Sequence, residues 1–480
     1  MGLRTADQYL KGLRDDRRVR YRGETVEDVV AHPELGLAAR HASLDFALAE
    51  RASHSDLAIR HDGDQPYSAY FQVPRTTDDL AARSALVEAA TREGDTLVLL
   101  IKEIGTDALF ALMRVLERYG LDEGQARVHE FHRHCRDGDL SLAVAQTDVK
   151  GDRSKGPSEQ ADPDLNLRVV ETRDEGIVVR GAKSHTSCSP YVDELLVLPS
   201  RRMRPGEEDW AVAFAVPVDT PGLTLYAADF LHGDFSSFDR PVSSRHKMIE
   251  TLTVFDDVLV PWDRVFLHGE AEAGGATALT FVEYHRFTAV SYKLPLLDAL
   301  VGTAIAVAEA NGIGRAGHVR DKLTWLAGYA ETARGLIQLA AQRGDEESGI
   351  AYPDVFTTNL AKWTFARDIH YAFEVVQDLA GGLLVTGPSA VDWQAPEIRP
   401  ILEKYLAAAW PAADRMAVMN LARDLTTDLY GGYQAVLALH AEGSLEAEKL
   451  QMYRAYDHEP ALTYALGLAG LRDTQDDPTA

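Results

Sequence analysis

A strand-rich segment near the middle of the chain, residues 139–199, constrains the fold most, because the sequence on both sides of it has helical periodicity. The turn signal Asp174-Glu175-Gly176 separates two short strand patterns and is typical of a β-hairpin. Strands are predicted at residues 140–145, 165–170, 177–179 and 194–198. The segment therefore predicts a β meander inside a mostly helical chain, with Thr147 and Ser187 where strands end.

The N-terminal region up to about residue 135 is predicted to be mainly helical, with a short hairpin at residues 20–26. Thr76 followed by Asp78 and Asp79 is a good helix start, because a hydroxyl caps the first turn and acids favour it. The helical spacing then continues to about residue 119, with breaks predicted near Gly94 and Gly105.

The strand patterns end with an apolar run at residues 252–260. From about residue 277 the pattern is helical again, and three long helices are predicted at residues 281–312, 319–343 and 359–384. The order helical, strand-rich, helical predicts a multi-domain α+β protein.

Composition narrows the function classes. A net charge of −25 argues against a nucleic-acid partner and an anionic membrane surface. Cys135 and Cys188 are too few for a disulfide framework or a four-cysteine cluster. Residues 1–19 are charged rather than signal-like, and no run has the apolar length of a membrane span, so a cytoplasmic protein is expected.

Several blocks in order carry a resemblance to a known family. They are Gln146-Thr147-Asp148 with Gly151-Asp152-Arg153-Ser154, Gly181-x-Lys183-x-His185-Thr186-Ser187, residues 254–266, and Gln377 to Gly382. The chain resembles the acyl-CoA dehydrogenase-like flavoproteins that unite 4-hydroxyphenylacetate 3-monooxygenases with 4-hydroxybutyryl-CoA dehydratases. The resemblance implies an N-terminal α-helical domain (1–135), a central β domain (136–270) and a C-terminal helical bundle (271–480).

The resemblance also implies a cofactor, FAD. Thr147 and Ser187 would hydrogen-bond the flavin ring, and Arg153 and Lys183 would supply cations to its pyrophosphate or to a substrate thioester tail. The complete set of implied cofactor-binding residues is Gln146, Thr147, Arg153, Thr186, Ser187, Gln377, Gly381 and Gly382, the last three reaching across a subunit interface. The alternatives are that Thr147 and Ser187 only satisfy turn backbone, and that Arg153 and Lys183 form structural ion pairs.

His285 leads the candidate catalytic residues, because the dehydratases place a histidine there. Tyr292 and Lys293 follow two turns later on the same predicted helix, and Glu250 matches an acidic residue of the dehydratase site. Together they would suffice for proton abstraction next to a carbonyl. The alternative is that His285 is a satisfied core residue.

Two departures from the family matter. Leu99, Glu103 and Tyr292 stand where the dehydratases have the three cysteines of an iron–sulfur cluster, so no cluster and no other metal is expected. Ile104, Ala108 and Val144 stand where the hydroxylases hold the phenol.

The leading hypothesis is the oxygenase component of a two-component monooxygenase, which receives reduced FADH2 from a separate flavin reductase and hydroxylates a small organic substrate. The alternative is a cluster-free FAD-dependent dehydratase, isomerase or dehydrogenase acting on an acyl thioester. A third is a binding protein that has lost catalysis. The family implies a homotetramer or homodimer.

Overall fold

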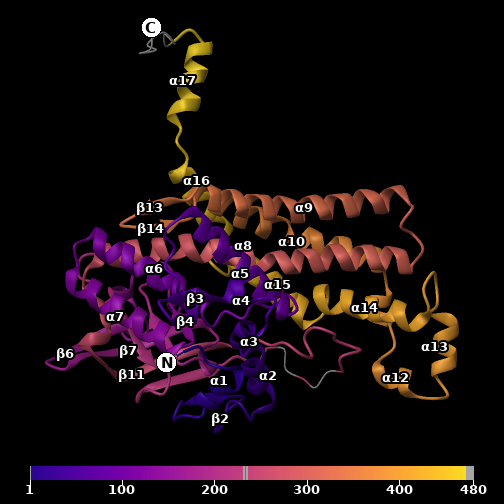
Figure 1. Cartoon of the computed structure of the whole chain (residues 1–480), viewed down its shortest axis with the longest axis horizontal. Helices are drawn as coiled ribbons and strands as arrows, with labels where there is room; N and C mark the ends of the chain where they lie inside the picture. The colour runs from indigo at the N-terminus through magenta and orange to yellow at the C-terminus, as the bar shows by residue number, and fades with distance from the viewer. Residues whose placement is uncertain (1, 231–232, 234–235, 472–480) are drawn as a thin grey trace.

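The computed structural model describes residues 2–230, 233 and 236–471. It confirms the predicted order of a helical region, a strand-rich region and a helical bundle (Figure 1). The N-terminal helices are α1 (Ala6–Gly12), α2 (Pro33–Ala42), α3 (Leu44–Glu50), α4 (Ser55–Ala58), α5 (Thr77–Glu93), α6 (Glu103–Arg118) and α7 (Asp122–Gly138). The expected domain boundary at residue 135 falls within α7, three residues before its end.

The strands form two main sheets rather than one meander, so that prediction is wrong. The first sheet has the order β2 (Glu24–Val26), β1 (Val19–Tyr21), β10 (Leu223–Ala227), β11 (Glu250–Pro261), β7 (Gly176–Ser187) and β6 (Arg168–Arg173). The second has the order β12 (Val265–His268), β9 (Val212–Pro217), β8 (Glu194–Val197) and β5 (Leu142–Ala145).

The strands β5 and β8 explain why the meander prediction is wrong. Every residue of both strands is buried, and they pair in parallel, as strands covered on both faces often do. The predicted hairpin around Asp174-Glu175-Gly176 is confirmed, because β6 and β7 pair antiparallel across it. The chain therefore leaves the second sheet after β5, makes a hairpin in the first, and returns as β8.

The N-terminal hairpin β1–β2 extends the first sheet. It is the hairpin predicted at residues 20–26, and β1 pairs in parallel with β10, so that Val19 lies opposite Leu225. Two smaller hairpins, β3 (Ile59–Asp62) with β4 (Gln65–Ser68) and β13 (Asp345–Glu347) with β14 (Ile350–Tyr352), lie outside the main sheets.

The C-terminal bundle is built around α8 (Ala271–Ala310), α9 (Gly317–Gln342) and α10 (Val355–Ala380). Helix α8 is long and apolar enough to cross a membrane, yet 67% of its most apolar window is buried inside the fold, as in the core helix of a bundle. The remaining helices are α11 (Leu383–Thr386), α12 (Ala390–Gln394), α13 (Arg399–Tyr405), α14 (Ala412–Thr426), α15 (Leu429–His440), α16 (Leu445–Ala455) and α17 (Glu459–Leu468).

Two local predictions in the N-terminal region are confirmed and one is wrong. Thr76 caps α5 as predicted, accepting a hydrogen bond from the amide of Asp79, and α5 ends at Gly94. The predicted break at Gly105 is wrong, because α6 runs through it. A Cβ at Gly105 would lie 2.2 Å from a Leu142 side-chain atom, so the glycine permits close packing of α6 on β5.

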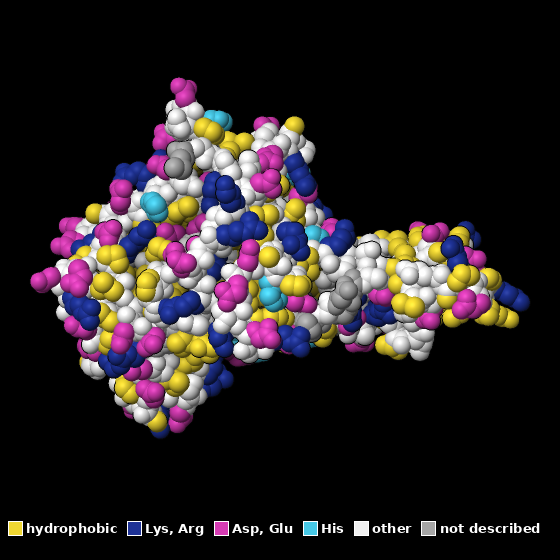
Figure 2. All heavy atoms as spheres, turned by 90° about the horizontal axis from the view of Figure 1, so that it is seen from below, with side chains coloured by type: hydrophobic (Ala, Val, Ile, Leu, Met, Phe, Trp, Pro, Cys, Tyr) yellow, Lys and Arg dark blue, Asp and Glu magenta, His cyan; other side chains and the backbone are white. Residues whose placement is uncertain are grey.

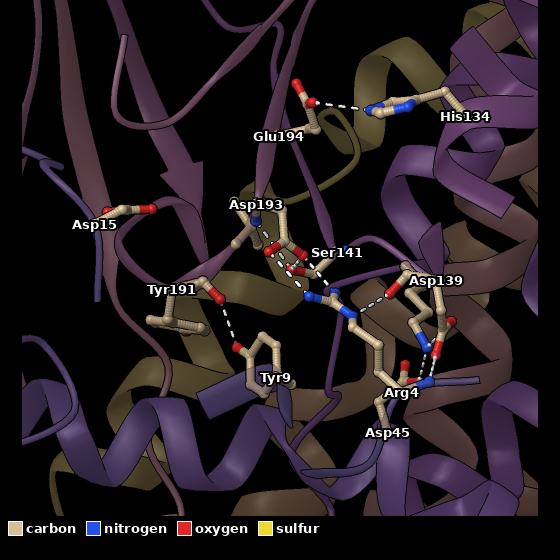
Figure 3. A network of polar contacts seen from close by, with 12 residues as sticks. Arg4, Tyr9, Asp15, Asp45, His134, Asp139, Ser141, Tyr191, Asp193 and Glu194 are labelled. Carbon is tan, nitrogen blue, oxygen red and sulfur yellow. Dashed lines mark hydrogen bonds and ion pairs between the residues drawn. The ribbon is translucent and has the colours of Figure 1, made fainter. Parts of the chain in front are cut away.

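A buried ionic network ties the N-terminus to the central strands (Figure 3). Arg4 makes a bidentate pair with Asp193, at 3.1 and 2.5 Å, and donates from Nε to the carbonyl of Asp139 at 2.8 Å. Ser141 donates to Asp193 from both its amide and its hydroxyl, at 2.7 and 2.6 Å. Lys102 lies between Asp45 and Asp139, at 3.0 and 2.8 Å. Arg4 therefore ties the segment before α1 to the end of α7 and the start of β8, and Lys102 ties α3 to the end of α7.

Candidate functional site

A cavity of about 1330 Å³ lies where the two sheets meet the helical bundle. Its lining comes from the α5–α6 loop, the end of β5 and the loop after it, the end of β7, the start of β11, one face of α8, and the α15–α16 region. All three expected domains therefore contribute to one chamber.

The sheet wall of the cavity is built by a cross-strand pair. Ser187 ends β7 and lies opposite Glu250, the first residue of β11. The Ser187 hydroxyl donates to Glu250 Oε2 at 2.7 Å, and the Tyr433 hydroxyl of α15 donates to Oε1 at 3.0 Å. Burial raises the pKa of Glu250 above its ordinary value, and these two hydroxyls only partly offset the effect.

The other expected cofactor residues of the β region divide into two groups. Gln146, Thr147 and Arg153 line the same cavity as Ser187. The side chain of Thr186 is fully buried behind the sheet wall, and its Oγ1 has no hydrogen-bond partner among the described residues. Lys183 has a structural role, since its Nζ contacts Asp148 Oδ1 at 2.6 Å and two carbonyl oxygens at 3.0 Å.

Helix α8 presents His285 and Tyr292 to the cavity from one face, as their spacing of seven residues predicts. His285 Nδ1 lies 3.2 Å from Asp107 Oδ2 of α6. A carboxylate accepts hydrogen bonds, so this contact favours a ring hydrogen on Nδ1, and in the neutral ring Nε2 is then the acceptor. Asp107 is itself held by Arg83 at 2.7 Å and Thr288 at 3.0 Å.

Lys293 lies behind the cavity wall in a second polar network. Its Nζ contacts Glu442 Oε2 at 2.9 Å, and Lys362 Nζ lies 3.5 Å from the same oxygen. The Tyr292 hydroxyl also donates to Glu442. Burial alone would raise the pKa of Glu442, but Lys293 and Lys362 lower it to about 2. This carboxylate therefore stays ionised and fixes the α15–α16 loop on α8.

The mouth of the cavity carries cations without carboxylate partners. Lys150, Arg153, Arg201 and Arg454 all line it, and none of them forms an ion pair within the described part of the chain. In a chain with a net charge of −25, four such cations around one opening favour an anionic ligand there.

One part of the cavity wall is apolar. Ile104 and Val144, two of the positions where the hydroxylases hold the phenol, line the cavity with Val98, Leu100 and Phe281. Ala108, the third such position, is fully buried. Among the positions of the cluster cysteines, Leu99 and Glu103 are buried and only Tyr292 lines the cavity. No group of three or more His, Cys, Asp or Glu side chains suited to a metal occurs among the described residues.

The Gln377 to Gly382 block lies at the end of α10, apart from the cavity lining of the described chain. Gln377 Nε2 donates to the carbonyl of Thr426 at 2.8 Å. A Cβ added at Gly381 or Gly382 would meet none of the described atoms within 4 Å, so this backbone is open to approach from outside.

Four polar residues of the site were missed at the sequence level: Asp107, Tyr433, His440 and Glu442. His440 and Tyr433 are one face of α15, and a spacing of seven residues with aromatic character was the available signal. Asp107 and Glu442 act through contacts far apart in sequence, for which one sequence contains no signal.

Comparison with known proteins places the whole chain in one group. A model described as the 4-hydroxyphenylacetate 3-hydroxylase N terminal matches residues 5–267, and one for the C terminal matches residues 275–470. The oxygenase component of 4-hydroxyphenylacetate 3-monooxygenase from Thermus thermophilus is 30% identical over 95% of both chains. The 4-hydroxybutyryl-CoA dehydratase/vinylacetyl-CoA-Δ-isomerase of Clostridium aminobutyricum is 29% identical over 98% of this chain and 100% of its own.

Solved structures agree. An oxygenase component of 4-hydroxyphenylacetate 3-monooxygenase complexed with FAD has a TM-score of 0.90 at 29% identity, covering 97% of this chain and 98% of its own. A 4-hydroxybutyryl-CoA dehydratase from N. maritimus also has a TM-score of 0.90 at 29% identity, covering 99% and 96%. These matches confirm the predicted acyl-CoA dehydrogenase-like fold and the resemblance to both branches.

Proposed function

Because the chain belongs to the 4-hydroxyphenylacetate 3-hydroxylase family, we propose that it is the oxygenase component of a two-component flavin-dependent monooxygenase. It takes reduced FAD from a separate flavin reductase and hydroxylates a small organic or aromatic substrate. The observation that supports this most is that one cavity is lined by polar groups able to hydrogen-bond a flavin, by apolar side chains, and by cations at its mouth. We propose a cytoplasmic setting for this role.

The donor set of the cavity fits FAD. The unpaired cations at the mouth suit its phosphates, and Gln146, Thr147 and Ser187 provide an amide and two hydroxyls for the polar edge of the flavin. The volume of about 1330 Å³ exceeds the ~300–1,000 Å³ of ordinary ligand pockets, which leaves room for a substrate beside the cofactor.

Reduced FAD, when bound, supplies the electrons with which molecular oxygen is activated. The chain's own residues hold and shield the reactants. The Ser187 hydrogen points to Glu250, so Ser187 offers an acceptor toward the flavin edge. His285 keeps Nε2 free to accept a proton from a substrate hydroxyl or carbon, while Asp107 fixes the ring. The apolar wall excludes water from the substrate.

A second candidate is a cluster-free dehydratase, isomerase or dehydrogenase acting on an acyl thioester. It is favoured by His285 and Glu250, which line the same cavity and could serve as base and acid. The substitution of the phenol-holding positions by Ile104 and Val144 also leaves this candidate open.

The protein is proposed to work as a homodimer or homotetramer. Helix α17 has no buried residue and extends away from the body (Figure 1). Hydrophobic side chains also gather on the narrow end of the molecule (Figure 2). The highly exposed apolar residues in these regions are Val385, Val391, Tyr405, Tyr464 and Leu468, at 69–75% exposure. In such an assembly we propose that Gln377, Gly381 and Gly382, whose backbone is open on the outside at the two glycines, contact a cofactor bound to the neighbouring copy.

Spectroscopy and turnover test the proposal. The purified protein, mixed with FAD, NADH, a flavin reductase and oxygen, is expected to add one oxygen atom to a member of a panel of phenols, as detected by mass spectrometry. It should bind reduced FAD more tightly than oxidised FAD. Tightly held oxidised FAD together with oxygen-independent conversion of an acyl thioester would instead establish the second candidate.

A further inference from the structure

The three carboxylates that line the cavity differ in what balances their charge. Glu272 pairs with Arg202 at 2.9 Å, and Glu442 pairs with Lys293 at 2.9 Å. Glu250 forms no ion pair within the described ranges, and its contacts are the two hydroxyls of Ser187 and Tyr433.

The geometry of Glu250 leaves room for another donor. A carboxylate has about four acceptor positions, and the two hydroxyls occupy two of them. Each hydroxyl has one hydrogen: Ser187 donates its hydrogen to Glu250, and Tyr433 shares its hydrogen between Glu250 and Met248 Sδ, which lies 3.5 Å away. Neither hydroxyl has a second hydrogen for the carboxylate. The remaining positions belong to a group that lines the cavity, and they are open to a ligand that enters it.

The charge of Glu250 also favours a cationic ligand. Removing a carboxylate from water without a cationic partner is costly, so a buried carboxylate either takes up a proton or needs a cationic partner. The burial that raises the pKa of Glu250 reflects this cost. A ligand cation would remove it.

The surroundings of Glu250 suit an organic cation better than a metal ion. The Tyr433 ring is packed against Phe230 at 5.6 Å between centroids, and its hydroxyl holds the carboxylate. Aromatic faces attract organic ammonium groups, whereas a metal ion would need further oxygen or nitrogen ligands. The apolar wall formed by Ile104, Val144 and Phe281 provides the surface for a hydrocarbon or aromatic body.

We infer that the substrate carries a protonated amine on a small apolar or aromatic body, and that Glu250 binds the amine. This rests on the proposed function in that the flavin occupies the Thr147–Ser187 edge and its phosphates neutralise the cationic mouth. The amine then lies deep in the cavity, and the ring or chain lies along the apolar wall.

Three phenols that share a ring and differ in one side chain test the inference: tyramine, neutral 4-ethylphenol and anionic 4-hydroxyphenylacetate. Their dissociation constants are measured calorimetrically at pH 7.5 with the full chain, alone and with saturating FAD. We expect tyramine to bind at least about tenfold more tightly than 4-ethylphenol, as for a hydrogen bond to a charged group. Glu250→Gln should abolish that difference and leave the affinity for 4-ethylphenol within about twofold.

The controls separate the possible failures. Glu309→Gln removes an exposed carboxylate from the same chain, and it should leave the preference for tyramine unchanged. Tyr433→Phe, which keeps the ring and frees one carboxylate oxygen, should retain the preference, and it serves as the second variant if Glu250→Gln does not fold. Equal affinity for tyramine and 4-ethylphenol, or a tyramine preference that survives Glu250→Gln, would overturn the inference. A failure of FAD to bind would count against the proposed function, and the titration without FAD would still decide the question of the amine.

Discussion

Two regions of the molecule hold buried or half-buried charges, and they treat them in opposite ways. In the network around Arg4 and Lys102 every charge meets a partner: Asp193 is bidentate with Arg4, and Lys102 bridges Asp45 and Asp139. In the cavity, Glu250 has only hydroxyl partners and the cations at the mouth have no ion pair within the described residues. Paired charges hold elements together, whereas unpaired charges around a cavity are available to a ligand.

The difference also appears in acid–base behaviour. Burial would raise the pKa of Asp193, but Arg4 and Ser141 lower it below its ordinary value. Burial raises the pKa of Glu250, and the hydrogen bonds from Ser187 and Tyr433 offset only part of that rise. A buried carboxylate thus stabilises the folded state at Asp193, where a cation pairs with it, and destabilises it at Glu250, where its described partners are hydroxyls.

The largest effect is expected from breaking the paired network. Lys102→Met leaves the Asp45 and Asp139 carboxylates, both at most 2% exposed, without their cation. The free energy of unfolding, measured by urea denaturation, should fall by about 3–5 kcal/mol. Arg202→Met is the matched control, because its pair with Glu272 is more than 70% exposed on both sides and should contribute less than about 1 kcal/mol. Equal losses in the two variants would contradict the comparison.

The flavin edge is expected to be nearly as sensitive. Replacing both Thr147 and Ser187 by Val should weaken FAD binding by about 1–3 kcal/mol for each hydroxyl, because polar atoms of the ring lose their partners. Fluorescence titration measures the dissociation constant for FAD, and circular dichroism checks that the variant is folded. Unchanged affinity in a folded double variant would place the ring elsewhere.

A third change concerns His285. His285→Gln should fold and keep its affinity for FAD, yet lose at least about a hundredfold in turnover, the low end of general-base effects. Product formation with reduced FAD supplied is the assay. A loss below about tenfold in the folded variant would give His285 a structural role, in agreement with its alternative interpretation as a satisfied core residue.

A smaller effect is expected at the cationic mouth. Arg153→Gln removes one exposed cation and should weaken FAD binding by about fivefold or less at low salt, with the difference shrinking toward 1 M salt. Arg133→Gln on α7 is the control, since Arg133 is exposed far from the lining. A salt-independent loss would indicate that Arg153 acts on the fold rather than on an anion.

The smallest effect concerns stability and pH. The raised pKa of Glu250 means that the folded state holds this proton more tightly than the unfolded chain does. Its contribution to stability is therefore complete below the ordinary pKa of 4.5 and is lost as pH rises through the raised value. Glu250→Gln should accordingly melt at a higher temperature than the original protein at pH 8 and at the same temperature at pH 4. Among the described residues, Ser187 and Tyr433 are the donors to this carboxylate, and both are neutral hydroxyls.

The parts of the fold that could be predicted from sequence depend on local signals. The Thr76 cap, the turn at Asp174-Glu175-Gly176 and the long C-terminal helices each result from contacts within a few residues, and all are present. The assignment of β5 and β8 to a separate sheet could not be predicted, because buried parallel strands resemble any short apolar run. The break predicted at Gly105 is wrong because this glycine makes room for the side chain of Leu142, which lies 37 residues later in the chain.

The residues of the candidate site also divide into those predicted by local spacing and those that depend on long-range contacts. His285 and Tyr292 share a helix face and both line the cavity, as their spacing predicts, whereas Lys293 lies one position further along the helix and is not part of the lining. The Ser187–Glu250 pair depends on the register of two strands 63 residues apart. Tyr433 and Glu442 come from the C-terminal region, which folds back over the β region. Local sequence patterns contain no signal for such long-range packing.

The parallel pairing of β1 with β10 also has a consequence for biosynthesis. Val19 cannot pair until Leu225 has been synthesised. At about 5–20 residues per second, synthesis of the intervening chain takes on the order of 10–40 s. During that interval the nascent hairpin β1–β2 has an unpaired edge and three side chains destined for burial, Val19, Tyr21 and Val26. Its protection by a nascent-chain chaperone, or its slow docking as the last step of sheet formation, would therefore govern the yield of active protein in the cell.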